Sequence, residues 1–165
     1  MGVSGCGKST VGGALAERLG WTFLEADDLH PPANVAKMRS GRPLDDTDRA
    51  PWLARLRAAI ARYRGRCQPL VLACSALTAA HRDAMTPHGC ELVYVHLRGP
   101  RPLLEERLAA RRGHYMPASL LPSQLQLLEP PGSAITIDIR LPIERQVDAI
   151  VAGLRAEAVD TEPRR

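Results

Sequence analysis

The sequence predicts an α/β fold built around a parallel sheet. Strand patterns and helix patterns alternate along the chain, which is typical of parallel strands joined by helices. Residues 69–77 (PLVLACSAL) form a continuous apolar run, as expected for a strand that is buried on both faces. The chain also opens with a glycine-rich turn that leads directly into an amphipathic helix. Its 165 residues suit a single domain, 1–165, with a core of its own.

The individual elements follow from the apolar periodicity and from the turn residues between them. Strands are predicted at 21–27, 69–77, 91–97 and 133–139. Helices are predicted at 8–19, 31–41, 47–65, 78–85, 100–113 and 141–158, with Asp48 as the N-cap of the third. Residues 114–132 are rich in proline and are predicted to form a loop with a short helix. The polar tail from about 157 to 165 is expected to fray.

The composition argues against several classes of function. The net charge is +4, but the basic residues are spread along the chain and aromatic residues make up only 4%, which disfavours nucleic-acid binding. No apolar run approaches the roughly 18–20 residues that span a bilayer, and residues 1–20 lack a signal-peptide pattern, so we expect no membrane partner and a cytoplasmic location. The four cysteines show no metal-binding spacing and are predicted to be free thiols.

The start of the chain matches the phosphate-binding pattern G-x-x-x-x-G-K-[ST] at every fixed position. Glycines allow backbone N–H groups to turn inward around phosphate oxygens, and the positive end of the following helix points at the same anion. Lys8 is expected to reach the β- and γ-phosphates of ATP, and the Ser9 hydroxyl to bind Mg²⁺. The predicted nucleotide-binding residues are Gly2, Val3, Ser4, Gly5, Cys6, Gly7, Lys8, Ser9 and Thr10.

Triphosphate binding alone fits a small-molecule kinase, a regulatory nucleotide switch or an ATPase that acts on nucleic acid. The chain is short for effector or translocating modules, and it contains no guanine-specifying NKxD sequence. A kinase is therefore the preferred interpretation. A nucleotide-binding regulator without turnover is the alternative from another class.

Further segments follow the phosphate loop in a fixed order: EADDLHP, NVAKM, GRPLDDTDRAPWL, ACSALTAAHRD and RRGHYMPASLLPSQLQLLEPP. From residue 1 to about residue 154 the chain closely resembles the gluconokinases, a shikimate-kinase-like group of small kinases. The resemblance implies Mg²⁺-dependent phosphorylation of D-gluconate by ATP in carbohydrate metabolism, and a homodimer. It implies a P-loop kinase fold with a five-stranded parallel sheet of order 2-3-1-4-5 and a lid at about 111–130. Shikimate kinase, or a kinase for another small hydroxy acid, is the nearest enzymatic alternative.

Several residues are candidates for the acceptor side of such a kinase. Asp27 follows the strand predicted at 21–27, where ligands of open α/β sheets gather, so its carboxylate is expected to accept the proton of the attacking hydroxyl or to hold a Mg²⁺-bound water. His30 is either a substrate-orienting residue or a packed structural histidine. Lys37 is the only lysine besides Lys8 and is expected to shape or charge the acceptor pocket, with a solvated helix residue as the alternative.

The resemblance suggests roles for five more residues. Arg49 and Arg82 lie in its segments and are expected to meet the acceptor carboxylate, because a guanidinium binds a carboxylate through two hydrogen bonds. Arg111 is the preferred lid arginine for the charge that develops on the transferred phosphoryl group. His114 and Gln124 are similar to residues of the lid and of the substrate side.

The resemblance also concerns the region ahead of the phosphate loop. In this fold the first strand precedes the loop at the centre of the sheet, and the given sequence starts at the loop. We therefore expect roughly 6–12 further residues upstream, a strand of typical length with a short lead-in.

Overall fold

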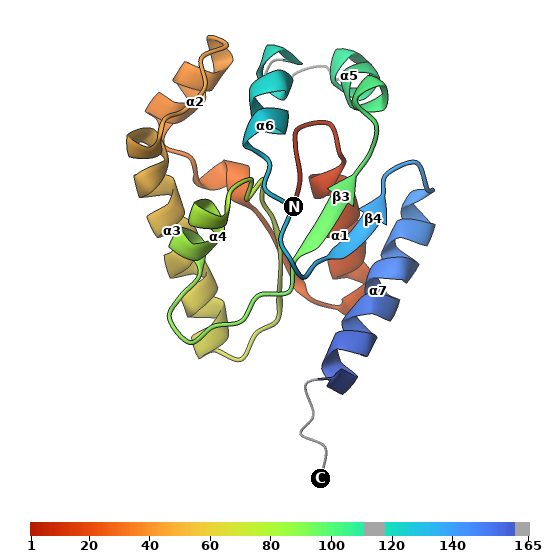
Figure 1. Cartoon of the computed structure of the whole chain (residues 1–165). Coiled ribbons are helices and arrows are strands. Elements are labelled where there is room, and N and C mark those ends of the chain that lie inside the picture. Colours follow the sequence, from red (N-terminus) through yellow and green to blue (C-terminus); the bar gives the residue numbers. More distant parts are fainter. Residues whose placement is uncertain (111–117, 161–165) are drawn as a thin grey trace.

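The structure is a computed structural model and describes residues 1–110 and 118–160. It has the predicted alternation of strands and helices (Figure 1). The strands are β1 (Thr22–Glu25), β2 (Leu70–Ala73), β3 (Val95–Arg98) and β4 (Ile135–Asp138). The helices are α1 (Lys8–Leu19), α2 (Pro32–Arg39), α3 (Asp46–Gly65), α4 (Ala79–Met85), α5 (Arg101–Ala110), α6 (Leu121–Leu127) and α7 (Ile143–Asp160), with short 3₁₀ turns at Ala26–Leu29 and Ala118–Leu120.

The four strands form two parallel pairs, β1 with β2 and β3 with β4. The backbone of Met1 and Gly2 lies between the pairs. Figure 1 shows the N-terminus in the middle of the molecule. The amino group of Met1 donates to the Val95 carbonyl, and the Met1 carbonyl accepts from the Leu97 N–H at 3.0 Å. On the other side, the Gly2 N–H donates to the Ser75 carbonyl at 3.3 Å. These bonds connect the phosphate loop to both pairs of strands.

An apolar cavity of about 390 Å³ lies behind this connection, between β2 and β3. Its lining includes Leu15, Ile60, Val71, Val95, Leu97 and Ile150. Residues 91–94 also border the cavity, and among the described residues no strand on the β2 side pairs with them. This explains why β3 begins at Val95, although the sequence predicts a strand over 91–97.

Two apolar clusters form the main core. The larger one joins α1, α5 and α7 to β3 and β4, with Val11, Leu104 and Ile150 among its buried side chains. The other packs α3 and α4 against the end of β2, with Leu56 and Met85 buried. The phosphate loop is therefore held from both sides by packed helices. Within the described residues, no helix combines the length and apolar character needed to cross a membrane.

The ends of two helices differ from the sequence-based prediction. The N-cap of α3 is Asp45, so the prediction that Asp48 is the N-cap is wrong. Asp45 accepts from the Asp48 N–H at 2.9 Å, and the Asp48 carboxylate accepts from the Asp45 N–H at 3.0 Å, which completes a capping box. At the other end of the chain, α7 continues to Asp160, past the position near 157 where fraying is predicted.

Candidate active site

The phosphate loop has the backbone that its glycines require. Gly5 and Gly7 have φ values of 83° and 94°, in the left-handed region that favours glycine. A Cβ on Gly5 would lie 2.9 Å from the Leu104 carbonyl oxygen, so a side chain there would collide with α5. Gly7 is the N-cap of α1, and the first turn of that helix begins with Lys8. The loop thus presents a helix N-terminus together with a lysine, as an anion site needs.

A cavity of about 300 Å³ opens over this loop. It is lined by every residue from Ser4 to Val11 and by Asp27, Arg107, Ile143 and Gln146. Arg107 comes from the last turn of α5 and is held by a 2.9 Å bond from Nη2 to the Ile139 carbonyl. This bond directs a guanidinium toward the phosphate loop, beside Gly7.

A second, smaller cavity of about 70 Å³ adjoins the first. Its polar lining consists of Ser4, Lys8, Asp27, His30, Arg49, Ser75, His81, Ser123 and Gln124. Three of these residues, Ser4, Lys8 and Asp27, also line the phosphate cavity. Lys8 and Asp27 therefore stand where the two cavities meet. A group transferred from one cavity to the other would pass between a cation and a carboxylate.

His30 is fixed against the tryptophan of α3. Its ring stacks on Trp52 with centroids 4.4 Å apart and planes 11° apart, and Trp52 Nε1 donates to the Ala26 carbonyl at 2.7 Å. The His30 Nδ1 atom is buried and has no hydrogen-bond partner among the described residues. Burial lowers the pKa of His30 below its usual value, with Asp27 opposing and Arg49 adding to the effect. His30 is therefore uncharged at neutral pH.

His81 and Arg49 lie on the other side of this cavity. The Arg49 side chain is only 16% exposed, and its Nη1 is 3.4 Å from the Asp46 carboxylate, which is 95% exposed. His81 Nε2 is 3.8 Å from the same carboxylate. Burial lowers the pKa of His81, and Arg49 lowers it further. The cavity thus combines cationic Arg49 and Lys8 with two uncharged imidazoles.

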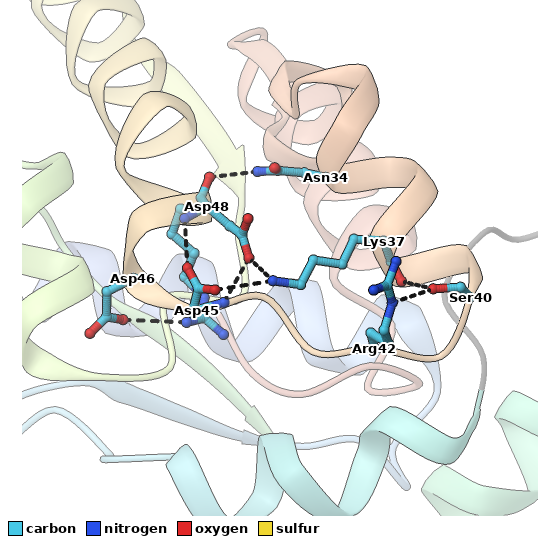
Figure 2. A network of polar contacts seen from close by, with 8 residues as sticks. Asn34, Lys37, Ser40, Arg42, Asp45, Asp46 and Asp48 are labelled. Atoms are coloured by element: carbon cyan, nitrogen blue, oxygen red, sulfur yellow. Dashed lines mark hydrogen bonds and ion pairs between the residues drawn. The ribbon is translucent and has the colours of Figure 1, made fainter.

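Lys37 does not line either of these two cavities. Figure 2 shows its side chain extending from α2 to the start of α3. Its Nζ is 3.0 Å from the Asp45 carboxylate and pairs closely with the Asp48 carboxylate. Asn34, also on α2, donates to the Asp48 carbonyl at 2.7 Å. Lys37 therefore joins α2 to the helix that carries Arg49.

Other predicted site residues have different surroundings. Arg82 is 8% exposed and donates to three backbone carbonyls, and it lines neither of the two polar cavities. The expectation that Arg82 faces the acceptor stays a prediction, and in this structure the Arg82 guanidinium donates to backbone carbonyls. Gln124 lies in the smaller cavity, where its Oε1 accepts from the Ser4 N–H at 2.7 Å. Arg111 and His114 lie outside the described residues.

The sequence analysis missed three residues of the site. These are Trp52 and His81, which line the smaller cavity, and Arg107, which lines the phosphate cavity. The sequence signal for His81 is Thr78, a favourable N-cap residue three positions ahead of it, which places His81 in the first turn of the helix after β2.

The carboxylates of Glu25 and Asp27 lie near Ser9, and carboxylate oxygens are ligands that Mg²⁺ prefers. Burial raises the pKa of Glu25, at the end of β1, while a hydrogen bond with the Ser9 side chain opposes the shift. Asp27 lies in the same cavity as Ser9. No cluster of three or more candidate metal ligands occurs among the described residues.

Two adjoining cavities, one built on a phosphate loop and one lined by polar side chains, define a P-loop kinase for a small acceptor. The AAA domain family matches residues 1–131 of the chain. The chain is similar to the gluconokinase of Gluconobacter oxydans, with 47% identity over 93% of this chain and 86% of the relative. It is also similar to the structure of a gluconokinase from Sinorhizobium meliloti, with 43% identity, a TM-score of 0.81, and coverage of 97% and 91% of the two chains. The chain belongs to the gluconokinase family.

A more distant structure supports the fold alone. The APS kinase of Mycobacterium tuberculosis, in complex with AMPPNP and APS, has 21% sequence identity and a TM-score of 0.64, and the match covers 94% of each chain. The P-loop kinase fold is therefore shared well beyond the gluconokinases.

The lowered pKa values of the buried histidines should make the stability of the fold depend on pH. Burial lowers the pKa values of His30, His81 and His96 below the ordinary 6.5, so the unfolded chain binds protons more readily. The free energy of unfolding should therefore fall as the pH drops below about 6.5, and urea unfolding at about pH 7.5 and 5.5 measures the difference. His30→Phe keeps an aromatic ring against Trp52 and should reduce this pH dependence. An identical dependence in His30→Phe would remove His30 from the explanation.

Proposed function

We propose that the protein transfers the γ-phosphoryl group of ATP to D-gluconate and forms 6-phosphogluconate. The observation that carries this proposal is the meeting of the two cavities at Lys8 and Asp27. Phosphoryl transfer depends mainly on positioning and on charge stabilisation, and this arrangement supplies both. The gluconokinases to which the chain is similar supply the identity of the acceptor.

The donor side consists of the phosphate loop and the cations around it. Backbone N–H groups of Gly5–Thr10 and the Lys8 ammonium hold the phosphates, and Arg107 adds a second cation to the same cavity. Arg111 is the lid arginine that we propose for the developing charge. Ser9, with Asp27 through a water, would hold Mg²⁺, whose bound form neutralises phosphate charge.

The acceptor side recognises a carboxylate and several hydroxyls. Arg49 is the proposed partner of the gluconate carboxylate, because its side chain is largely buried in the smaller cavity. Among the described residues its one ion pair is with the exposed carboxylate of Asp46, at 3.4 Å. His30, His81 and Gln124 are proposed to meet the hydroxyls, since they are uncharged and line the same cavity. Asp27 accepts the proton from the attacking hydroxyl. His114 joins this side as a proposed lid residue.

We also propose that the complete sheet has five strands in the order 2-3-1-4-5, with a strand joined to Met1 in the central place. The apolar cavity of about 390 Å³ between β2 and β3 supports this proposal. So do the backbone hydrogen bonds of Met1 and Gly2, which already run between both pairs of strands. The strands β1 to β4 then correspond to the second to fifth strands of the sheet.

The first prediction from the proposed function concerns turnover. ATP and Mg²⁺ should support ADP release with gluconate and much less with shikimate or other sugar acids. Lys8→Ala should lower kcat by orders of magnitude at unchanged folding, because the ammonium acts on the transferring phosphates. A coupled ADP assay over a panel of acids measures both. Near parental turnover in Lys8→Ala would refute the role of the phosphate loop, and a different preferred acid would refute gluconate as the acceptor.

The second prediction concerns Lys37. Lys37→Met breaks both contacts with Asp45 and Asp48 and loosens α2 from the helix that carries Arg49. The KM for gluconate should rise about threefold to tenfold while the KM for ATP changes little. Arg39→Met, at an exposed position on the same helix, is the matched control. If the two variants have the same KM values, Lys37 has no role in the acceptor site and is a solvated helix residue.

The third prediction concerns the cavity between β2 and β3. An apolar extension of about six residues joined to Met1 should raise the unfolding temperature strongly, since each buried aliphatic side chain is worth about 1.5–3 kcal/mol. An extension of equal length made of glycine and serine is the control. If both extensions give the same unfolding temperature by calorimetry, the proposed central strand is wrong.

A further inference from the structure

Arg82 and Glu129 connect two distant parts of the chain, and the catalytic site described above uses neither. Arg82 Nη1 donates to the carbonyls of Ala76 at 3.1 Å, Leu77 at 3.4 Å and Glu129 at 2.8 Å. Glu129 in turn donates its N–H to the Leu77 carbonyl at 2.8 Å. Its carboxylate accepts from the Ala79 N–H at 2.7 Å. These five residues, Ala76, Leu77, Ala79, Arg82 and Glu129, form what we call the Arg82–Glu129 junction.

The junction holds backbone that would be costly to leave unsupported. Ala76 has φ 44°, a left-handed conformation that is unfavourable for alanine, and it is 2% exposed. Arg82 is itself 8% exposed and lies over the Tyr94 ring at 5.9 Å, and no carboxylate among the described residues forms an ion pair with it. Because the buried Arg82 guanidinium donates hydrogen bonds to these carbonyls, it holds the turn after β2 in a fixed conformation.

Each side of the junction leads to one wall of the acceptor cavity. The turn after β2 and the first turn of α4 supply Ser75, Leu77 and His81. The 3₁₀ turn and α6 supply the facing wall, with Leu120, Ser123, Gln124 and Leu127. Glu129 follows α6 by two residues, so its bonds to Leu77 and Ala79 fix the end of α6 against α4.

We propose that Arg82 and Glu129 are positioning residues that set the spacing between these two walls, and thereby the affinity for the acceptor. The proposal rests on the acceptor cavity assigned under the proposed function. Gln124 ties α6 to the phosphate loop through Ser4, and Glu129 ties it to α4, so the helix is held at two points. Loss of the second point lets the walls separate while the nucleotide side stays intact.

Glu129→Ala tests the proposal with little risk to folding, because Glu129 is exposed. Removal of its bond to Ala79 should raise the KM for gluconate about fivefold, the factor expected for a lost helix cap, with the KM for ATP nearly unchanged. Glu129→Gln keeps an oxygen that accepts from the Ala79 N–H, so its KM for gluconate should equal that of the unsubstituted protein. Glu105→Ala, which removes an exposed glutamate 2.7 Å from Arg101 on α5, is the matched control.

The outcomes are distinct. An unchanged KM for gluconate in Glu129→Ala, or an equal rise in both KM values, overturns the proposal. Arg49→Ala in the same assay tests the acceptor cavity itself: if its KM for gluconate rises while that of Glu129→Ala does not, the cavity assignment stands and the junction fails. Hydrogen exchange gives a readout without turnover, since amides at 79–81 and 120–128 should exchange faster in Glu129→Ala than in Glu105→Ala.

Discussion

The backbone hydrogen bonds of Met1 and Gly2 are the connection on which the site depends. They hold the start of the phosphate loop between Ser75, two residues past β2, and the strand β3. Because the loop is fixed at this point, Lys8 and α1 begin at the carboxyl ends of the strands, where both cavities open. The two packed clusters on either side of the loop keep it there.

The acceptor side is assembled differently, from side chains that join separate elements. Lys37 and Asn34 connect α2 to α3, Trp52 holds His30, and Gln124 connects α6 to the phosphate loop. Burial keeps the two imidazoles uncharged, so the positive charge of the smaller cavity comes from Arg49 and Lys8. A small anionic acceptor therefore meets a few charges in defined places within a largely neutral lining.

Most of the predictions that the structure confirms come from patterns formed by residues close together in the sequence. The helix over 8–19 and the phosphate loop depend on neighbouring residues, and both occur as predicted. Gluconokinase membership also followed from ordered segments, and the relatives confirm it. The role of each site residue stays a prediction, although the structure brings Asp27, His30, Arg49 and Gln124 into one cavity.

The rest depended on contacts between distant residues. Asp45 and Asp48 are both able to cap a helix, and the backbone conformation of Asp45 decides between them. His81 and Arg82 are neighbours on a helix and point in different directions, so only the packing of α4 against Glu129 determines which one reaches the cavity. The start of β3 likewise depends on where Met1 lies.

The ion pairs at the start of α3 have a consequence for the solvent conditions in which the protein works. The Asp45 carboxylate is 62% exposed and the Lys37 side chain 27%, so dissolved ions reach this contact readily. Dissolved salt weakens exposed ion pairs, so the Lys37–Asp45 contact loses strength as the ionic strength rises, while the Lys37–Asp48 contact, in which the Asp48 side chain is 24% exposed, loses less. The phosphate loop is held by backbone hydrogen bonds and packing, which salt affects far less. Rising ionic strength should therefore weaken the hold on the acceptor before it disturbs the hold on the nucleotide-binding loop.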